Sequence, residues 1–449
     1  MHTKRVLFKK LKLHHANKKY ANWFDDPIVK KYIYSSKKKI DIISLKKYIS
    51  KNNKNKSTLL FGIFTIDQNE HIGNIKFDDI NVKKNRVTMG ILIGDRNFRG
   101  VGIFNEVIEF FSDYFFNEFK ITNIYLGVDK KNKIAIKSYF KSGFKITSEF
   151  FKEKKLNAIY MVKKYNLFKK IIIGTAQFSK NYGINRNNSI DKSFKKKIIN
   201  FSLKNNLKFF DTSNVYNEYK NLFSNNMDQQ IILKIFFKQN IDDINQFTEH
   251  LVNTHMSKFN IDKFYGILIH NFEQLPSNQI KKIFKILKIL KEKGITNKIG
   301  ISIYDCNKII KIINKYQFDI LQCPFSIFDQ RLLDNNTINK IKKTKIEIHA
   351  RSIFLQGLLL KNEIDGYFDK WNKKFNNYSE WIKKNKIDRM QSALNFVLNH
   401  NFIDKIVIGF DSEKQINDIL CRLEEYYFLK FPNYLKVDDI KLINPSNWK

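Results

Sequence analysis

Four polar residues in the second half of the sequence stand where short apolar runs end. Asp211 and Tyr216 accompany the run Lys208–Thr212, Lys234 lies near the end of the next run, and His270 directly follows the one after that. A tyrosine, whose pKa is normally near ~10, can give a proton to a carbonyl oxygen, and a neighbouring lysine would lower that pKa. Asp211 would hold the lysine, and His270 would orient the carbonyl group. Together the four residues predict a site that protonates a carbonyl oxygen.

A glycine-rich turn in the first half is the second candidate site. The segment Gly94–Ile103 follows a strand-like run, and Gly100 and Gly102 would let backbone N–H groups come close to a ligand. The N-terminus of the following helix would add the positive end of its dipole, so the segment suits a pyrophosphate. A dinucleotide-binding fold is disfavoured, because the extended strand–helix–strand context and the downstream acid are missing. A plain tight turn is the alternative interpretation.

The elements that must carry this turn lie within Met1–Lys164. Apolar runs at Leu59–Ile66, Val87–Ile93 and Ile124–Val128 predict strands, and Phe104–Phe119 has apolar residues at helical spacing. We therefore expect a mixed α/β domain over residues 1–164.

After a short basic linker, residues 165–170, the chain alternates apolar runs with amphipathic stretches such as Gln279–Lys293. Eight strand–helix units over residues 171–449 match a (β/α)8 barrel, with an open doubly wound sheet as the alternative. In a barrel the ends of neighbouring strands share one face, which would bring Asp211, Lys234 and His270 together. The expected strands are Ile171–Thr175, Lys208–Thr212, Gln230–Ile235, Tyr265–Ile269, Lys298–Ser302, Asp319–Gln322, Ile346–Ala350 and Lys405–Gly409.

Length and composition agree with two globular domains. The 449 residues exceed one ordinary domain, and a hydrophobic share of 43% excludes wholesale disorder. The 3 cysteines form no C-x-x-C pair, so neither a disulfide framework nor a metal site is expected. No apolar run reaches the ~18–20 residues of a membrane span, and the first residues lack a signal-peptide pattern. The expected compartment is the cytoplasm.

A formal charge of +38 raises the question of a nucleic-acid partner. Only 9 of the 81 basic residues are arginines, whereas proteins that read phosphates or bases usually draw on the arginine fork. Lysine is abundant together with Asn, Ile and Phe, which share A/T-rich codons, so a drift in composition explains the charge. Nucleic acid is not the expected partner, although a basic nucleic-acid- or ribosome-associated protein stays an alternative.

The glycine-rich turn has neighbours that give it a family resemblance. Trp23–Tyr32 and His71–Lys76 precede it, and the residues that follow it are Asn132, Ala135, Tyr139, Lys141, Gly143 and Phe144. In this order the sequence resembles the GNAT acetyltransferases, most closely the branch that acetylates ribosomal-protein N-termini and nucleotide-linked amino sugars. The resemblance implies acetyl-CoA as cofactor, with Tyr139 protonating the departing CoA thiolate and Asn132 contacting the cofactor arm. It also implies a pyrophosphate held by the backbone of Arg99, Gly100, Val101, Gly102 and Ile103.

Three points within this resemblance stay open. Asn97 stands where the family usually has Gln or Arg, a change that concerns affinity more than activity, because the turn works through backbone donors. Tyr139 could simply pack beside Phe140 and Phe144. The base that would deprotonate the amine is not identified; the candidates are a water chain, His71, Asp78, Asp79 and Glu149.

The second stretch resembles the aldo-keto reductases along its length. Asp211, Tyr216, Lys234 and His270 fill the four catalytic positions, and further matching segments are Ile173–Phe178, Lys298–Tyr304, Gln322–Arg331, Ala350–Leu358 and Ile408–Ser412. The resemblance implies hydride transfer from a nicotinamide to an aldehyde or ketone, with Tyr216 as the acid. It also implies cofactor contacts near the nicotinamide from Ser302 and Gln322, and near the adenosine phosphate from Gly409, Ser412 and Gln415.

Departures from the reductase pattern affect the cofactor and the substrate side. NADPH is the expected cofactor. NADH is the alternative, because Asp411 stands where many members carry a basic residue that binds the 2′-phosphate; Lys414 is a candidate to compensate for this change. Ser326 replaces a common Asn. Only 17 residues separate Tyr216 from Lys234, which leaves little room for the usual second helix.

These observations predict a bifunctional enzyme that acts on small molecules. One half would be an acetyl-CoA-dependent N-acetyltransferase, and the other an NAD(P)H-dependent reductase of an aldehyde or ketone. Nucleotide-linked sugars of surface-polysaccharide synthesis would suit both chemistries. In the alternative, only the reductase is active and the N-terminal half is a binding module. The sequence does not indicate an oligomeric state.

Overall fold

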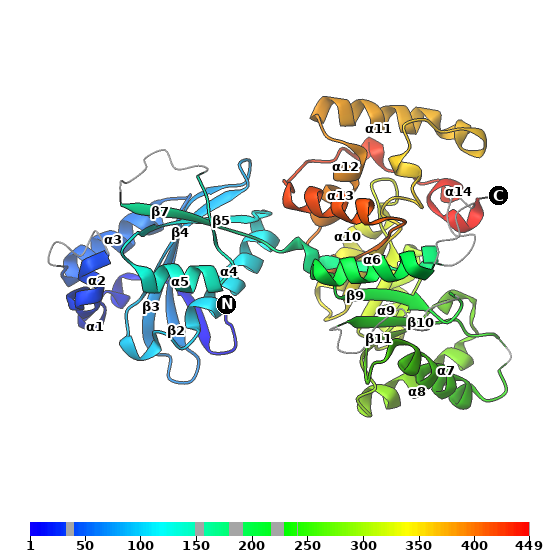
Figure 1. Ribbon diagram of the computed structural model, residues 1–449, viewed down its shortest axis with the longest axis horizontal. Coiled ribbons are helices and arrows are strands. Elements are labelled where there is room, and N and C mark those ends of the chain that lie inside the picture. Colours follow the sequence, from blue (N-terminus) through cyan, green and yellow to red (C-terminus); the bar gives the residue numbers. More distant parts are fainter. Residues whose placement is uncertain (33–39, 149–156, 179–191, 217–228, 240, 449) are drawn as a thin grey trace. The chain divides into compact units, whose positions relative to one another are not determined.

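The apolar runs of the sequence form two separate sheets, one in each of two units, Met1–Tyr165 and Asn166–Lys449. The computed structural model describes residues 1–32, 40–148, 157–178, 192–216, 229–239 and 241–448 (Figure 1). In this described part of the chain, no helix combines the length and the apolar character needed to cross a bilayer.

The sheet of the first unit has the strand order β1-β2-β3-β4-β5-β7-β6. Its neighbouring strands are antiparallel except for β4 and β5, which run parallel. This parallel pairing extends only from Arg86↔Asn123 to Thr88↔Tyr125, so the carboxyl-terminal parts of β4 and β5 have no ladder between them. The strands are β1 (Val6–Lys10), β2 (Leu59–Thr65), β3 (His71–Asn81), β4 (Arg86–Ile93), β5 (Asn123–Asp129), β6 (Lys145–Ile146) and β7 (Ala158–Lys164).

Helices cover both faces of this sheet (Figure 1). On one face α4 (Ile103–Phe119) buries Phe111 and its neighbours against Phe61 of β2. Leu60, the preceding residue of β2, points to the opposite face, because successive side chains of a strand alternate, and it packs there with Leu45. The helices on that side are α1 (Lys18–Asn22) and α3 (Ile42–Lys54), with α2 (Pro27–Tyr32) beyond them. The helix α5 (Lys133–Lys141), which follows β5, packs on the α4 side through Ile136 and Tyr139. The predicted helix and strands are confirmed with shifts of one residue at their ends.

The second unit is a closed barrel of eight parallel strands in the order β10-β11-β12-β13-β14-β15-β8-β9. The predicted barrel is thereby confirmed, and the open sheet is excluded because β8 pairs with both β15 and β9. The strands are β8 (Ile171–Gly174), β9 (Phe209–Ser213), β10 (Gln230–Ile235), β11 (Phe264–Ile269), β12 (Thr296–Ser302), β13 (Ile320–Pro324), β14 (Glu347–Arg351) and β15 (Lys405–Gly409), each within two residues of its expected run.

Helices follow most of these strands and surround the barrel (Figure 1). The expected amphipathic helix is α8 (Ser277–Glu292), which buries Ile283, Leu287 and their neighbours. The other helices of this unit are α6 (Lys192–Lys204), α7 (Ile244–Phe259), α9 (Ile309–Lys315), α10 (Asn335–Lys342), α11 (Asn372–Asn385), α12 (Arg389–Leu398), α13 (Glu413–Glu424) and α14 (Ile440–Ile443).

A polar cluster lies at the amino end of the barrel. The Tyr265 hydroxyl donates to Glu347 at 2.8 Å, Lys298 pairs with the same carboxylate, and the Nε2 atom of His349 lies 3.0 Å from it. These residues come from β11, β12 and β14, which are not all neighbours, so they meet through the barrel interior. Burial opposes the ionisation of Glu347, but the hydrogen bonds and charges of His349 and Lys298 lower its pKa to about 2. The side chains of β14 at this spacing therefore face inward.

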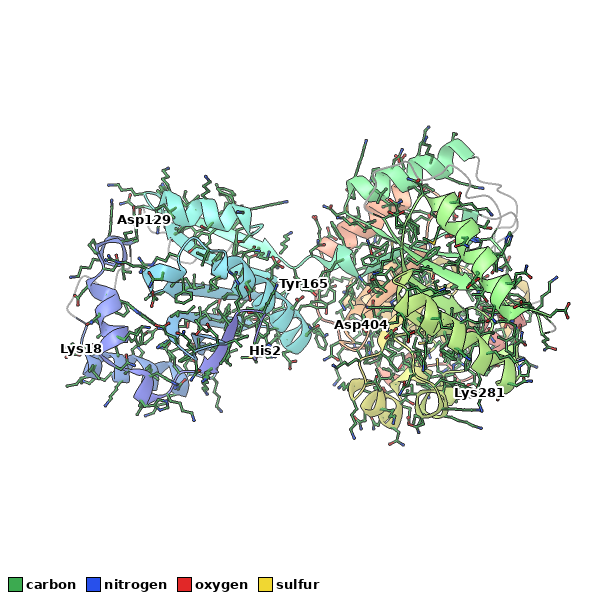
Figure 2. All side chains as sticks on the ribbon, turned by 90° about the horizontal axis from the view of Figure 1, so that it is seen from below. His2, Lys18, Asp129, Tyr165, Lys281 and Asp404 are labelled. Atoms are coloured by element: carbon green, nitrogen blue, oxygen red, sulfur yellow. The ribbon has the colours of Figure 1, made fainter. Side chains whose placement is uncertain are left out.

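The predicted linker is in close contact with its neighbours in the structure. Tyr165, labelled in Figure 2, stacks on Phe116 of α4 with ring centroids 4.4 Å apart. From Leu167 to Lys170 the chain forms a 3-10 helix, and Lys170 Nζ donates to the carbonyl oxygen of Ile403 at 2.6 Å. The residues after Tyr165 therefore pack on the barrel unit. Unlike the buried Lys170, Lys18 and Lys281 are exposed to solvent (Figure 2).

Candidate active sites

The glycine-rich turn lies just after the open end of the β4–β5 pair. Gly100 has a φ of 77° and Gly102 a φ of 85°, a left-handed backbone that glycine adopts without strain. Gly102 is the N-cap of α4, and no described side chain caps this end of the helix. The first N–H groups of the helix are therefore left for a ligand. The turn fits the pyrophosphate of acetyl-CoA.

The side chains of Arg99 and Arg96 support the turn. Arg99 donates to the carbonyl oxygens of Ile93 and Gly94 at 2.8 and 2.7 Å, and both arginines donate to Asp26 Oδ2 at 2.8 Å. Burial opposes the ionisation of Asp26, but the hydrogen bonds from Arg96 and Arg99 outweigh it and lower the pKa to about 2. Arg99 thus offers a ligand its backbone, while its side chain ties the turn to Asp26.

Arg5, just before β1, is a second support for the turn, and it was missed in the sequence. Its Nη1 donates to the carbonyl oxygen of Val101 at 2.9 Å, and its Nε donates to Glu106 Oε2 at 2.7 Å. Glu106 lies in the first turn of α4 and also accepts the Thr3 hydroxyl. Arg5 Nη2 lies 3.5 Å from the place that a Cβ on Gly102 would take. Nothing in the spacing links Arg5 to a residue 96 positions later.

Tyr139 and Asn132 belong to the helix α5 and its N-cap. The Tyr139 ring packs edge-on against Phe104, with centroids 5.2 Å apart, and lies 5.7 Å from the ring of Phe144. Phe140, the other expected neighbour, is 49% exposed. Burial raises the pKa of Tyr139 to about 12, so the phenol keeps its proton at neutral pH. The side-chain oxygen of Asn132 caps α5 by accepting a backbone N–H at 3.2 Å. This contact leaves fewer polar atoms of Asn132 for the expected contact with the cofactor arm.

The described candidates for the acetyltransferase base all have partners. His71 Nε2 lies 2.9 Å from Asn74 Oδ1, and burial lowers the pKa of this histidine to about 4. Asp78 and Asp79 each form an ion pair with a nearby basic residue, at 2.7 and 2.9 Å. Glu149 lies outside the described residues. The structure therefore does not single out one of them.

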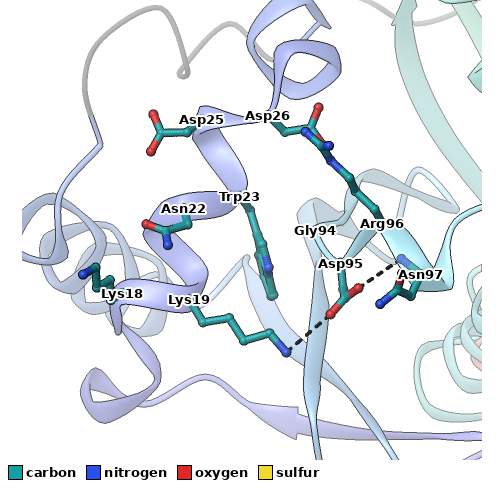
Figure 3. A pocket seen from close by; sticks show the side chains of 10 residues that line it. All are labelled: Lys18, Lys19, Asn22, Trp23, Asp25, Asp26, Gly94, Asp95, Arg96 and Asn97. Atoms are coloured by element: carbon teal, nitrogen blue, oxygen red, sulfur yellow. Dashed lines mark hydrogen bonds and ion pairs between the residues drawn. The ribbon is translucent and has the colours of Figure 1, made fainter.

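A cleft of about 730 Å³ opens beside the turn (Figure 3). Trp23 forms one wall and packs on Gly94 so closely that a Cβ there would lie 1.9 Å from the Cδ2 of the indole. Asp95 accepts the backbone N–H of Asn97 at 3.0 Å and lies 3.4 Å from Lys19 Nζ. Carboxylates and cations line the cleft together, which suits a ligand bearing both an amine and an anionic group. The lining residues are Lys18, Lys19, Asn22, Trp23, Asp25, Asp26, Gly94, Asp95, Arg96 and Asn97.

At the carboxyl end of the barrel, Asp211 and Lys234 form a buried ion pair. Asp211 Oδ1 lies 2.6 Å from Lys234 Nζ, and the two side chains are 2% and 6% exposed. Gln322 donates to Asp211 Oδ2 at 2.7 Å, and its Oε1 accepts from Lys234 at 3.4 Å and from Ser302 at 3.5 Å. The structure thus joins residues of β9, β10, β12 and β13 in one network across the barrel.

Tyr216 and His270 border this pair. The Tyr216 ring lies 5.4 Å from Lys234 Nζ, and its centroid lies 5.8 Å from that of the His270 ring. Burial, followed by the charge of Asp211, raises the pKa of Tyr216. The lowering expected from Lys234 is not found; the charge of Asp211, the ion-pair partner of Lys234, raises the pKa of Tyr216 instead. Burial and the charges of Lys234 and Arg351 lower the pKa of His270 to about 2, so at neutral pH the imidazole is neutral and the phenol protonated.

The residues expected near the adenosine phosphate gather at the N-terminus of α13. Ser412 caps this helix by accepting the N–H of Gln415 at 3.1 Å, and Gln415 Oε1 accepts the N–H of Asp411 at 2.8 Å. A Cβ on Gly409 would lie 1.4 Å from Gln177 Oε1, a buried acceptor that has no partner among the described residues. An unpaired acceptor beside a glycine and a helix N-terminus fits a dinucleotide, which carries hydroxyl donors and phosphates.

Two family models match this sequence. The model of the Aldo/keto reductase family matches residues 170–427, more than half of the chain. The chain belongs to the aldo/keto reductase family. The model of the Acetyltransferase (GNAT) domain matches residues 5–145, so this reductase also carries an acetyltransferase domain. The two domains give the protein oxidoreductase and acyltransferase activity. Aldo-keto reductases in general use NAD(P)H, and GNAT domains use acetyl-CoA.

Solved structures resemble each half of the reductase chain. The aldo-keto reductase AKR11C1 from Bacillus halodurans, in its holo form, is 16% identical, covers 58% of this chain and 88% of its own, and has a TM-score of 0.48. A GNAT-family acetyltransferase from Bacillus anthracis is 18% identical, covers 37% of this chain and 98% of its own, and has a TM-score of 0.32. No curated protein matches the chain.

Two residues of the reductase site were not assigned in the sequence. Ser213 is buried, and its Oγ lies 2.9 Å from His270 Nδ1. Arg351 ends β14 at the carboxyl end of the barrel and contributes to the pKa values of Tyr216 and His270. Ser213 follows Asp211 by two positions on β9, so its inward orientation could have been read from strand alternation. The loop whose shortness was noted after Tyr216 lies outside the described residues.

Proposed function

We propose that the barrel reduces an aldehyde or ketone to an alcohol, with Tyr216 as the proton donor. The observation that carries this proposal is the buried pair Asp211–Lys234 bordered by Tyr216 and His270 at the carboxyl end of the strands. Active sites of (β/α)8 barrels lie at that end.

Each of the four side chains has a defined task in the proposed reaction. NADPH, when bound, supplies the hydride that is added to the carbonyl carbon. Tyr216 gives its phenolic proton to the carbonyl oxygen, and the Lys234 ammonium stabilises the phenolate that is left. Asp211 holds the ammonium in place. His270 orients the carbonyl oxygen through Nε2, because its Nδ1 already faces Ser213. The phenolate then regains a proton from solvent.

The reductase proposal is tested by the loss of NADPH absorbance with a panel of aldehydes and ketones. We expect Tyr216→Phe to lower kcat by at least about a hundredfold, since general acid catalysis contributes a factor of that order, while NADPH binding is retained. Retained turnover by Tyr216→Phe would overturn the mechanism. The same assay with NADH decides the cofactor preference, for which NADPH is proposed despite Asp411.

We propose that the first unit transfers the acetyl group of acetyl-CoA to an amine. The uncapped N-terminus of α4 and the glycine-rich turn support this proposal, because they offer backbone donors to a pyrophosphate. The amine nitrogen would bond to the acetyl carbon, and the C–S bond would break. Tyr139 would give its proton to the departing thiolate, and its high pKa keeps that proton available. The cleft beside Asp95 would receive the amine.

The acetyltransferase proposal is tested by the release of free thiol from acetyl-CoA with a panel of amines. We expect Gly102→Val to abolish acetyl-CoA binding, because its φ of 85° strains any branched side chain and the new atoms enter the turn. Tyr139→Phe is expected to lower kcat about tenfold or more with little change in acetyl-CoA affinity. If both variants release thiol normally, the assignment fails.

We propose nucleotide-linked amino and keto sugars as the first substrates to try in both assays, because such a sugar family offers an amine to one half and a carbonyl to the other. This choice also follows the branch of acetyltransferases that the first unit resembles. Turnover of simple amines and aldehydes, without any turnover of nucleotide sugars, would contradict it.

A further inference from the structure

Arg351 lies at the open end of the barrel interior. It is the last residue of β14 and follows Glu347 and His349 at two-residue spacing. Glu347 meets Tyr265 and Lys298 inside the barrel, and His349 is fully buried. Because side chains of a strand alternate, Arg351 leaves the strand toward the same interior, at the end where Tyr216 and His270 lie.

Neutral groups hold the Arg351 guanidinium in position. Its Nη2 donates to the carbonyl oxygen of Ile303 at 2.8 Å, and its Nη1 donates to the Ser352 hydroxyl at 3.3 Å. The guanidinium carbon lies 4.0 Å from the centroid of the Tyr304 ring. These contacts fix the orientation of the planar group, yet none of them carries a negative charge. The side chain is only half-buried, so its free edge is accessible.

The carboxylates around this end of the barrel have other partners. Asp211 pairs with Lys234, and Asp329 forms a bidentate pair with Arg331. Glu273 accepts the backbone N–H groups of Tyr304 and Asp305, at 2.8 and 2.9 Å. Within the described part of the chain, no carboxylate lies at ion-pair distance from Arg351. Its positive charge is therefore left for a ligand.

We propose that Arg351 binds an anionic group of the carbonyl substrate, so that the reductase prefers aldehydes or ketones that carry a carboxylate or a phosphate. The proposal rests on the proposed reductase function. A guanidinium offers parallel N–H donors that match the oxygens of either anion. Arg351 ends β14 on the face of the barrel where the strands that position Asp211, Lys234 and His270 also end, so one ligand at that face can meet the guanidinium together with Tyr216 and His270. The anion would then help to place the carbonyl oxygen at the phenol.

The test compares matched pairs of carbonyl compounds in the NADPH oxidation assay. One pair is 4-carboxybenzaldehyde and its methyl ester, and the other is glyceraldehyde 3-phosphate and glyceraldehyde. For the wild type we expect kcat/KM at least about tenfold higher for one of the anions than for its neutral partner. Arg351→Met is expected to remove this preference, measured as the ratio of kcat/KM between the anion and its neutral partner, and Arg351→Lys to restore part of it. The pair that responds shows whether carboxylate or phosphate is the natural group.

Two controls separate the proposal from its alternatives. Arg389→Met removes another arginine without an ion-pair partner in the described structure, at the start of α12, and is expected to leave the preference intact. NADPH affinity, measured by fluorescence titration, is expected to be the same for Arg351→Met and the wild type. If Arg351→Met weakens the binding of NADPH as much as it lowers kcat/KM for the anionic substrate, Arg351 binds the cofactor and the proposal is wrong.

Binding measurements test the role of Arg351 even if the protein reduces none of these compounds. Binding of 4-carboxybenzyl alcohol and glycerol 3-phosphate, the products of the anionic compounds, is measured by calorimetry on protein saturated with NADP+. Wild-type binding that Arg351→Met lowers by about tenfold or more supports the anion site without any turnover. Equal binding, or none, by both proteins overturns it. Reduction of neutral carbonyls alone would support the reductase function and reject the role of Arg351.

Discussion

At the scale of single residues, burial is the largest cause of the pKa shifts of Tyr216 and His270, ahead of the neighbouring charges. The ordinary pKa of tyrosine lies well above neutrality, and burial moves that of Tyr216 further up. Burial moves the pKa of His270 in the other direction, to about 2. Both shifts favour the uncharged form, which is what a low-dielectric pocket does to an acid and to a base. The phenol and the imidazole are thus both held in the forms that can donate a hydrogen bond to a carbonyl oxygen.

A pH profile follows from these two shifts. Because the pKa of His270 lies far below its ordinary value, this imidazole stays neutral at every pH above about 4. We expect kcat/KM for carbonyl reduction to show no histidine inflection between about pH 5 and about pH 8. The measurement is initial-rate kinetics across that range in buffers of constant ionic strength. An inflection near the ordinary histidine pKa that disappears in His270→Gln would contradict this expectation.

Ser213 faces one of the two ring nitrogens of His270. Its Oγ lies 2.9 Å from His270 Nδ1, so a serine hydroxyl that donates to Nδ1 leaves the proton on Nε2, where the carbonyl would lie. We expect Ser213→Ala to lower kcat/KM about tenfold, the order of one lost orienting hydrogen bond, with unchanged NADPH affinity. Ser213→Thr, which keeps the hydroxyl, is expected to retain most of the rate. A normal rate for Ser213→Ala would show that the imidazole is oriented by other contacts.

At the scale of elements, the glycine-rich turn is held by a residue that lies outside both of the elements that flank it, β4 and α4. Arg5 joins the start of β1 to the turn through Val101 and to the first turn of α4 through Glu106. The Glu106 carboxylate lies close to where an anionic pyrophosphate would bind, and Arg5 compensates its charge. The hydrogen bonds from Thr3 and Arg5, together with the Arg5 charge, overcome burial and lower the pKa of Glu106. Arg5 is therefore a positioning residue.

A double-mutant cycle tests this role. We expect Arg5→Met to raise the Kd for acetyl-CoA about tenfold, because Glu106 is then left to repel the phosphates. Glu106→Gln alone is expected to have a smaller effect, and the double variant to bind better than Arg5→Met. Isothermal titration calorimetry gives the four affinities. If the double variant binds as weakly as Arg5→Met, Arg5 acts on the ligand or on Val101 and not through Glu106.

At the scale of the whole molecule, each unit has its own core and its own candidate cofactor site. The first unit spans Met1–Tyr165 and the second Asn166–Lys449, and the apolar cluster of each draws only on residues of that unit. Units built in this way commonly unfold as separate transitions. A ligand that binds one folded unit stabilises that unit by mass action.

Scanning calorimetry of the full chain tests this division. We expect two unfolding transitions. Acetyl-CoA is expected to raise the temperature of only one of them, and NADPH that of only the other. At a hundredfold excess over Kd, each ligand should add about 2–3 kcal/mol to the free energy of unfolding of its own unit. Gly102→Val is expected to abolish the acetyl-CoA shift and to leave the NADPH shift unchanged. A single transition raised by both ligands would show that the two units unfold together.

The sequence was sufficient for the parts of this protein that depend on local pattern. Eight apolar runs predicted eight strands, because a strand buried on both sides needs a continuous apolar stretch. The order Asp211, Tyr216, Lys234 and His270 on successive strands predicted their common location, since parallel strands end on one face. The turn around Gly100 and Gly102 was visible because few residues other than glycine accept its backbone.

Contacts between distant segments required the tertiary structure. Arg5 beside Gly102, Arg351 over Tyr304 and the pairing of Gln322 with Asp211 arise from strand register and barrel closure. The same is true of the direction in which the pKa of Tyr216 moves, where the sequence suggested Lys234 and the structure shows burial and Asp211. Spacing along a chain tells which face of an element a residue occupies. Which residues meet it there, and how much water they exclude, is set by packing among elements far apart in sequence.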